Sequence, residues 1–334
     1  PYNDIIRKFI DMYAGRLRNQ VSFMLSACNF YMPIFEEALD AYGLPLELRY
    51  LPIIESALNP SAVSRAGASG LWQFMIGTGK IYGLESNSLV DERRDPIKAT
   101  WAAARYLKEM YDIYGDWNLV IAAYNCGPGT INKAIRRANG ETDYWKIYNY
   151  LPKETRGYVP AFIAANYVMT YYCDHNICPM ETNIPASTDT VQVNKNLHFE
   201  QIADLCNVPL DQIKSLNPQY KKQMIPGDSK PYTLRLPIDA ISTFIDKQDT
   251  IYAHRADELF RNRKTVAVKE ITPSTRKTTT AVAGKGKLTY YTIKSGDTLS
   301  TIAGKYGVTI KDIQRWNGIS NTKIAAGKRL KIYK

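Results

Sequence analysis

The chain has 334 residues, of which 45% are hydrophobic and 22% are charged, a composition typical of soluble globular proteins with sizeable cores. Its length favours about two to three domains. No run of about 18 apolar residues occurs, so we expect no membrane-spanning helix. No glycine-rich phosphate loop follows a predicted strand, which argues against nucleotide chemistry. The sequence opens at Pro1 without a signal-peptide pattern, so we expect any signal or lipoprotein leader to lie outside it.

The net charge of +11 is concentrated near the C-terminus. Residues 261–334 contain 17 Lys and Arg against 3 Asp and Glu, so this stretch accounts for more than the whole positive charge. A basic segment of this kind suits nucleic acid, anionic lipid or an anionic polysaccharide, and it equally suits a solvated linker.

Five cysteines occur in the chain. The pair Cys173 and Cys178 encloses four residues, a spacing that allows a small loop disulfide. No second pair has the spacing of zinc ligands, so the cysteines do not indicate a metal site.

Residues 1–180 show helical patterns and no sustained alternation typical of strands. Leu46–Leu58 suits a helix that is kinked or restarted at Pro52 and ends before Asn59-Pro60, because a residue before proline disfavours the helical conformation. Three further helices are predicted: Ile97–Tyr111, with Asp95 as N-cap and Pro96 in the first turn; Asn118–Tyr124, ended by Gly127; and Tyr158–Tyr171. We therefore expect an α-rich first domain.

Two later segments, 191–237 and 291–332, are related at an offset of 100 residues. The matched positions are Val191 with Tyr291, Val193 with Ile293, Phe199 with Leu299, Ile202 with Ile302, Val208 with Val308, Ile213 with Ile313 and Asn217 with Asn317. Each copy is predicted as strand, helix, turn, helix and strand in under about 50 residues. Between the copies, Asp249–Phe260 is predicted to be helical and Arg263–Lys287 to be a flexible linker.

Glu55 interrupts an apolar stripe on the helix predicted for Leu46–Leu58. Leu48, Leu51 and Leu58 lie at helical spacing from it, so we expect its carboxylate to lose solvent and its pKa to rise. A carboxylic acid with a raised pKa suits a general acid near neutral pH. The same pattern also allows a glutamate at the edge of the core, paired with Arg49 or Arg65.

Three motifs surround and follow this glutamate. Residues 55–75 read ESALNPSAVSRAGASGLWQFM, residues 123–129 read AYNCGPG and residues 156–160 read RGYVP. In this order and spacing they resemble the signature of lytic transglycosylases of the lysozyme-like superfamily (glycoside hydrolase family twenty-three), over roughly residues 30–180. Trp72, where many relatives have Met, and the appended repeats resemble the membrane-bound D group of these enzymes most.

The resemblance implies a role for each matched residue. Glu55 falls on the catalytic acid/base. The residues expected to bind or surround the saccharide are Ser56, Ser64, Trp72, Gln73, Phe74, Tyr124, Asn125 and Tyr158. For Ser56 a hydroxyl that supports the helix end is the alternative, and for each aromatic residue core packing is the alternative.

Most glycosidases use two carboxylates, whereas these motifs supply one. In the family that they resemble, Glu55 would protonate the oxygen between N-acetylmuramic acid and N-acetylglucosamine, and then take the proton of the muramic C6 hydroxyl. That hydroxyl closes on C1 and gives a 1,6-anhydro end, with no metal and no organic cofactor. The alternatives are a hydrolase with an unrecognised second acid and a wall-binding scaffold without activity.

The second repeat resembles a LysM module, through YTIKSGDTLSTIA at residues 291–303. This implies binding of N-acetylglucosamine-containing glycans in a shallow groove formed by Gly296, Asp297, Thr298, Leu299, Ile319, Asn321 and Ile324. The first repeat departs from the pattern, because KNLHF replaces SGDTL at residues 195–199 and an insertion near Lys221–Lys230 lengthens its second loop. We interpret it as a degenerate LysM module with a mainly structural role.

These patterns predict a multidomain protein, with an α-rich lysozyme-like catalytic domain followed by two small α+β (βααβ) LysM modules. The expected parts are an N-terminal helical segment (1–30), the transglycosylase domain (31–185), the degenerate module (190–240), a helical and flexible basic linker (241–287) and the second LysM module (288–334). We expect a monomer that binds peptidoglycan glycan strands and no nucleic acid. We expect it in the periplasm or cell envelope of a bacterium, with a lipid anchor outside this sequence as one route to the outer membrane.

Overall fold

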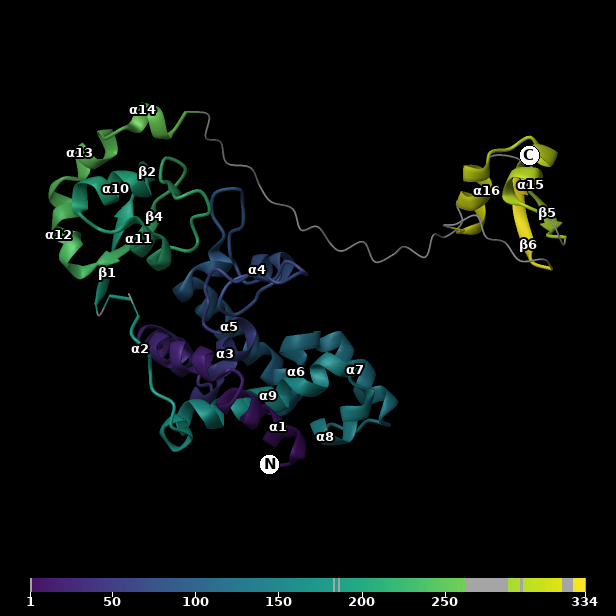
Figure 1. The fold of residues 1–334 in the computed structure, drawn as a ribbon, viewed down its shortest axis with the longest axis horizontal. Coiled ribbons are helices and arrows are strands. Elements are labelled where there is room, and N and C mark those ends of the chain that lie inside the picture. Colours follow the sequence, from purple (N-terminus) through teal and green to yellow (C-terminus); the bar gives the residue numbers. More distant parts are fainter. Residues whose placement is uncertain are drawn as a thin grey trace. The chain divides into compact units, whose positions relative to one another are not determined.

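The computed structural model describes residues 2–182, 184–185, 187–261, 288–294, 297–319 and 327–333. The chain forms two compact units, residues 1–270 and residues 271–334 (Figure 1). The first unit contains a helical domain, coloured purple to teal, and then the first repeat in green; the second unit contains the second repeat. Within the described ranges, no helix combines the length and the apolar character that a membrane span requires.

The first domain is helical, as the sequence predicts. Its α-helices are α1 (Asp4–Ala14), α2 (Arg18–Ala41), α3 (Leu51–Ser56), α4 (Ile76–Ile81), α5 (Pro96–Tyr114), α6 (Trp117–Cys126), α7 (Pro128–Arg137), α8 (Tyr144–Ile147) and α9 (Lys153–Thr170). Its 3-10 helices are η1 (Leu46–Tyr50), η2 (Glu92–Arg94), η3 (Tyr148–Tyr150) and η4 (Tyr172–His175). The predicted cap of α5 is confirmed, because the Asp95 side chain accepts hydrogen bonds from the amides of Ile97 and Lys98.

The helix predicted for Leu46–Leu58 is divided at the expected place. The 3-10 helix η1 ends at Tyr50, and α3 begins at Leu51 with Pro52 in its first turn. Proline is tolerated there because the backbone N–H groups of a first turn have no acceptor within the helix. Ala57 and Leu58 then adopt left-handed conformations, with φ of 52° and 59°, and end the helix before Asn59-Pro60. This short helix places Glu55 two residues before Ala57, where the chain leaves the helical path.

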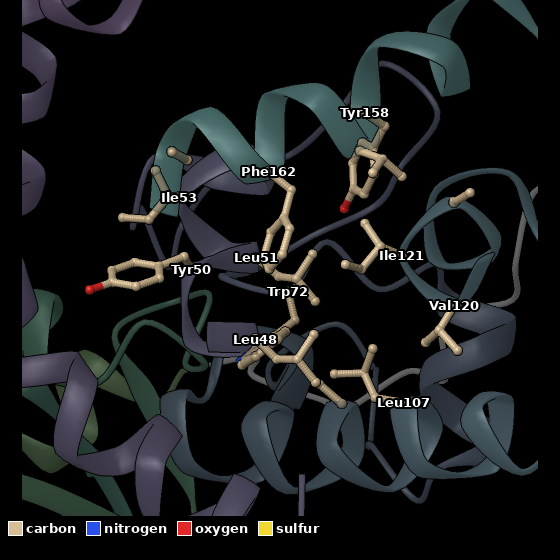
Figure 2. Close-up of a cluster of buried hydrophobic side chains, with 14 of the residues drawn as sticks. Leu48, Tyr50, Leu51, Ile53, Trp72, Leu107, Val120, Ile121, Tyr158 and Phe162 are labelled. Atoms are coloured by element: carbon tan, nitrogen blue, oxygen red, sulfur yellow. The ribbon is translucent and has the colours of Figure 1, made fainter. Parts of the chain in front are cut away.

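The core of the helical domain surrounds Trp72, whose side chain is fully buried. Figure 2 shows Trp72 between Leu48, Leu51 and Phe162, which come from η1, α3 and α9. Helix α2 packs against α5, and both α1 and α6 pack against α9. The boundary that we expected at residue 30 falls inside α2, so the N-terminal segment is not separate: α1 and α2 belong to the same core.

The first repeat shows the predicted order of strand, two helices and strand. Strand β1 (Thr188–Val193) pairs antiparallel with β4 (Tyr232–Pro237), with Val191 opposite Leu234, and the helices are α10 (Phe199–Cys206) and α11 (Leu210–Leu216). A second antiparallel pair joins β2 (Asn196–His198) to β3 (Met224–Pro226). This extra pair is built from the two places where the first repeat departs from the second.

The core of the first repeat extends beyond residue 240. Helices α12 (Ile238–Asp246), α13 (Gln248–Ala253) and α14 (Ala256–Leu259) follow β4, and the predicted helical stretch 249–260 corresponds to the last two. Ala240, Phe244 and Ile251 are buried in the same cluster as the strands. The linker expected to begin at residue 241 is therefore wrong in its first part, because these apolar residues cover the sheet. Residues 262–287 lie outside the described ranges.

The second repeat has the predicted βααβ order. Strand β5 (Leu288–Thr292) pairs antiparallel with β6 (Arg329–Tyr333), with Tyr291 opposite Leu330, and the helices are α15 (Leu299–Tyr306) and α16 (Ile310–Asn317). Thr298 and Thr309 cap the two helices through their hydroxyls. Ile302, Ile313 and Ile332 are buried between the helices and the strands.

One asparagine ties the second helix to the last strand in both repeats. In the first repeat, Asn217 Nδ2 donates to Arg235 O at 2.8 Å and Asn217 Oδ1 accepts from Arg235 N at 2.8 Å. In the second, Asn317 makes the same pair of hydrogen bonds with Lys331, at 2.8 and 2.6 Å. This shared two-bond clamp gives a structural reason for the matched asparagines.

Candidate active site

Glu55 lies in the last turn of α3, and its carboxylate is largely withdrawn from solvent. Burial raises its pKa from the ordinary range to about 7. A hydrogen bond from the Tyr158 hydroxyl lowers that pKa, and the charge of Glu154 raises it. Arg49 pairs with Glu36 instead, so the structure does not support the alternative that Arg49 neutralises Glu55. At neutral pH a large share of Glu55 is therefore protonated, as a general acid requires.

A pocket of about 410 Å³ opens beside Glu55. The predicted residues that line it with Glu55 are Ser56, Ser64 and Gln73. Among the residues that the structure describes, Glu55 is the one carboxylate in its lining. The pocket has room for part of a sugar chain, and the carboxyl group of Glu55 is the acid that it offers to a bound sugar.

The stretch 62–74, which we call the cleft loop, carries Ser64 and Gln73. Gln73 has a left-handed backbone conformation, with φ of 49°. Its side-chain Nε2 donates to Gly70 O at 2.7 Å and to Ala62 O at 3.3 Å. Ser64 Oγ accepts from the amide of Ala68 at 3.0 Å. Both side chains are therefore oriented by hydrogen bonds within the loop itself.

Ser56 supports the end of α3. Its hydroxyl lies 3.1 Å from Pro52 O and 2.9 Å from Leu71 O, so its donor is used by backbone carbonyls. This geometry favours the structural alternative for Ser56, although the residue also lines the pocket.

Two predicted residues from the second motif, Tyr124 and Asn125, lie outside the pocket lining. The Tyr124 hydroxyl donates to Trp72 O at 2.7 Å, and Asn125 Oδ1 accepts from Thr155 Oγ1 at 2.9 Å. Burial raises the pKa of Tyr124 and Tyr158 well above the ordinary value, and the charge of Glu55 adds to both shifts. Both tyrosines are thus neutral donors at any physiological pH.

Trp72 and Phe74 do not form walls of the pocket, which corrects the expectation that they stack on sugar rings. Trp72 is fully buried, and its Nε1 donates to Thr100 Oγ1 at 2.9 Å. Phe74 is 3% exposed and packs near Tyr82, Tyr106 and Tyr124. Both side chains belong to the hydrophobic core of the helical domain, so the core packing alternative holds for both.

The opposite side of the pocket comes from residues that the sequence did not indicate. They are Tyr13 in α1, Leu17 in the turn that follows, and Gln20 and Met24 in α2. Tyr13 is buried, which raises its pKa to about 12. The helical spacing of Ile6 and Tyr13 was the available signal, but it showed only that α1 buries one face.

The groove residues expected in the second repeat are described in part. Asp297 accepts from the Lys294 amide at 2.8 Å and from the Tyr291 hydroxyl at 2.8 Å, and Thr298 caps α15. Leu299 is buried in the core of the repeat, so its side chain cannot line a groove. Ile319 packs partly against the same core. Gly296, Asn321 and Ile324 lie outside the described residues.

The cysteines form no bridge in the structure. Cys173 lies in η4 and Cys178 follows it, and both are exposed free thiols, so the loop disulfide that their spacing allowed is absent. Between them Asn176 is left-handed and Ile177 is buried, and this path of the chain does not depend on a cross-link. Within the described ranges, no group of three or more His, Cys, Asp and Glu side chains is placed to hold a metal ion.

Family models match three parts of the chain. The Transglycosylase SLT domain matches residues 32–147, the LysM-like domain of lytic transglycosylase MltD matches residues 187–253, and the LysM domain matches residues 291–332. A lysozyme-like helical domain that matches the transglycosylase model, followed by LysM-type repeats, defines a lytic transglycosylase.

Comparison with individual proteins identifies the family. Membrane-bound lytic murein transglycosylase D of Escherichia coli (strain K12) is 32% identical over 338 residues, which cover 99% of this chain and 69% of that protein. The chain belongs to the membrane-bound lytic murein transglycosylase D family. An autolysin of Enterococcus faecalis is 53% identical over 49 residues, 15% of this chain and 7% of that protein. The crystal structure of the soluble lytic transglycosylase Slt70 from Escherichia coli aligns with 43% of this chain and 24% of that chain, at 29% identity and a TM-score of 0.38.

Proposed function

We propose that this chain cleaves the β-1,4 bond between N-acetylmuramic acid and N-acetylglucosamine in peptidoglycan without water, leaving 1,6-anhydro ends. The observation that carries the proposal is Glu55: a carboxyl with a pKa of about 7, alone among carboxylates in the described lining of its pocket. One acid that is protonated near neutral pH can give a proton and then take one back.

In the first step, protonated Glu55 donates its proton to the glycosidic oxygen, and the bond to C1 of the muramic residue breaks. The N-acetyl oxygen of that sugar stabilises the positive charge that develops at C1. The N-acetylglucosamine side leaves with the new hydroxyl.

In the second step, the Glu55 carboxylate removes the proton from the C6 hydroxyl of the same muramic residue. The C6 oxygen attacks C1 and closes the 1,6-anhydro ring, so the glutamate regains its proton. The hydrogen bond from Tyr158 steadies the carboxylate between the two steps. A second carboxylate is not needed, because the sugar supplies its own nucleophile.

The second repeat is proposed to bind N-acetylglucosamine-containing glycan and so to keep the catalytic domain near its polymer, through a raised effective concentration. Its basic surroundings favour association with the carboxylates of the cell wall. We place the monomeric enzyme in the periplasm or cell envelope, and a lipid anchor is proposed as its route to the outer membrane.

The test is mass spectrometry of the fragments released from purified sacculi by the wild-type chain and two variants. Glu55→Gln should retain the fold and release nothing. Glu154→Gln is the matched control, because Glu154 is an exposed carboxylate whose charge Glu55 senses.

We expect wild-type products that are one water lighter than hydrolysis products and that resist borohydride reduction. Reducible products of full mass would overturn the proposal in favour of a hydrolase. Normal release by Glu55→Gln would overturn the assignment of the acid, and binding without release by the wild-type chain would favour a scaffold.

A further inference from the structure

A loop of the helical domain is built into the first repeat. We call residues 85–91 the docking loop. Its Leu89 and Val90 are buried in the hydrophobic cluster of the first repeat, at 4% and 0% exposure. Val90 forms an antiparallel bridge with Tyr220, and the amide of Lys221 donates to Leu89 O at 2.8 Å. The docking loop therefore completes the core of the first repeat.

Charged side chains reinforce this contact. Lys221 Nζ lies 2.9 Å from Asn87 O and 3.7 Å from Asp91 Oδ2. Glu85 forms a second cluster, with Lys230 Nζ at 2.6 Å and the Tyr232 hydroxyl at 2.9 Å from its Oε2. Glu85 and Asp91, which lie near the first motif in the sequence, thus serve the contact between the domain and the repeat.

Asp91 links the first repeat to the cleft loop. Its amide donates to Gln219 O at 2.8 Å, and its two carboxylate oxygens each accept from Arg93 at 2.8 Å. Arg93 is almost fully buried, and its Nη1 donates to Gly67 O at 2.8 Å and to Phe74 O at 2.9 Å. Gly67 lies near the middle of the cleft loop, and Phe74 lies at its end, next to Gln73.

The backbone of η2 also touches the cleft loop directly. A Cβ on Gly70 would lie 1.7 Å from Arg93 O, so the two backbones are in close contact. Arg94 Nε donates to Ser69 Oγ at 3.0 Å. Gly70 in turn accepts the side-chain amide of Gln73. A continuous set of contacts therefore runs from Lys221 and Gln219 through Asp91 and Arg93 to a residue of the pocket.

We propose that the first repeat is a brace for the active site, with Lys221, Asp91 and Arg93 as positioning residues for the cleft loop. The proposal rests on the proposed function, because it assigns to the repeat a part in turnover rather than in glycan capture. A buried ion pair such as Asp91–Arg93 keeps its geometry only while all its partners are satisfied. The first repeat supplies the Lys221 ammonium beside the Asp91 carboxylate, and its Gln219 carbonyl holds the Asp91 backbone amide.

The test compares two triple variants of the full chain. Lys221→Met, Lys230→Met and Tyr232→Phe together remove the side-chain contacts that the repeat makes with Glu85, Asn87 and Asp91. The matched control is Lys195→Met, Lys222→Met and Tyr252→Phe, which changes the same residue types on the same repeat. Lys195 pairs with Asp249 and Lys222 is exposed, and among the described residues neither side chain forms a hydrogen bond or ion pair with the docking loop.

The substrate is soluble, uncrosslinked glycan strands, and retention on purified sacculi is measured separately. We expect kcat of the contact variant to fall roughly tenfold, since small displacements of positioning groups are costly. Its KM and its retention on sacculi should match the control. Hydrogen exchange should become faster at amides of residues 64–74 and stay unchanged in α5.

Equal kcat values for the two triple variants would overturn the proposal that the first repeat braces the active site. Weaker retention of the contact variant on sacculi with an unchanged kcat would also overturn it, and would assign the repeat a glycan-binding role instead. Should the triple variant not fold, the single variant Lys221→Met is compared with Lys221→Arg, which keeps the cation and should restore kcat. Hydrogen exchange of residues 64–74 does not depend on which reaction the enzyme catalyses. It therefore tests the contact between the first repeat and the cleft loop even if the products prove not to be 1,6-anhydro sugars.

Discussion

The hydroxyl of Tyr158 donates a hydrogen bond to the carboxylate of Glu55, although 103 residues separate them along the chain. The two residues come from α9 and α3, which pack against each other. Burial of Glu55 raises its pKa, and this hydrogen bond, which favours the charged form, opposes the increase. The pKa of about 7 results from the balance of these two effects, together with a smaller increase caused by the charge of Glu154.

Tyr158→Phe should move the pH dependence of turnover. Without the hydroxyl, burial acts unopposed, so the pKa of Glu55 should rise by roughly one unit. Because the protonated acid starts the reaction, the fall of kcat/KM on the alkaline side should shift to higher pH, while kcat itself falls. The measurement is a pH–rate profile on soluble glycan. An unchanged alkaline limb would show that Tyr158 does not control this carboxyl.

Glu55→Gln should stabilise the fold in a pH-dependent way. The unfolded glutamate loses its proton near pH 4.5 and the folded one near pH 7, so between these values the folded state binds more protons. Wild-type stability therefore falls as pH rises through this window and stays lower above it. We expect the variant to gain up to about 3 kcal/mol at pH 8 and little at pH 4. Urea unfolding at both pH values checks this, and an equal gain at both would contradict the raised pKa.

Trp72→Phe should lower stability without changing the products. The substitution removes buried volume and the hydrogen bond to Thr100, at a cost of about 2 kcal/mol. Trp101→Phe is the control, since Trp101 is 36% exposed and should change stability by under about 0.5 kcal/mol. Thermal unfolding and product analysis give the two readouts. A raised KM with unchanged stability would instead indicate that Trp72 contacts the saccharide.

Gly70→Ala should damage the cleft loop far more than Gly67→Ala. Both glycines have positive φ, 87° and 89°, so both alanines carry the same backbone strain of about 1 kcal/mol. Only the alanine at 70 would collide with Arg93 O, whereas nothing lies within 4 Å of a Cβ at 67. We expect a loss of at least about 3 kcal/mol for Gly70→Ala, measured by denaturant unfolding. Equal effects would show that η2 can move aside.

Asp297→Asn should weaken retention of the enzyme on sacculi. The carboxylate accepts hydrogen bonds from the Lys294 amide and the Tyr291 hydroxyl, which hold its pKa below the usual range and order the loop before α15. The carboxylate therefore keeps these bonds at neutral pH and loses them only as pH falls through that lowered value. Co-sedimentation is the measurement, with kcat on soluble glycan unchanged. Asp211→Asn in the first repeat is the control and should retain full binding.

Local sequence was sufficient to predict the helices and strands and the desolvation of Glu55, whereas its proposed role as the acid came from the resemblance of the motifs. Pro52 and Asn59-Pro60 restrict the backbone of their neighbours, so the short helix that carries Glu55 could be predicted from steric rules alone. The capping chemistry of Asp95 is equally local. The two repeats could be aligned because their cores and the clamp of Asn217 and Asn317 need the same residue types at the same spacing.

Which aromatic residues reach the pocket could not be decided in this way. Trp72 and Tyr13 are both large and amphipathic, yet the first is enclosed by η1, α3 and α9 while the second lines the pocket. The difference depends on how distant helices pack, which is not encoded in the residues beside either aromatic.

The sequence by itself determined the helical domain, the repeat pattern and the expected burial and raised pKa of Glu55, because these follow from spacing, backbone restriction and burial of a short apolar helix. Only the tertiary structure decided that α1 and α2 complete the pocket, that Tyr158 rather than an arginine faces Glu55, and that the docking loop enters the first repeat. These are contacts between segments far apart in the chain, and their energies depend on packing that forms only when the whole unit folds.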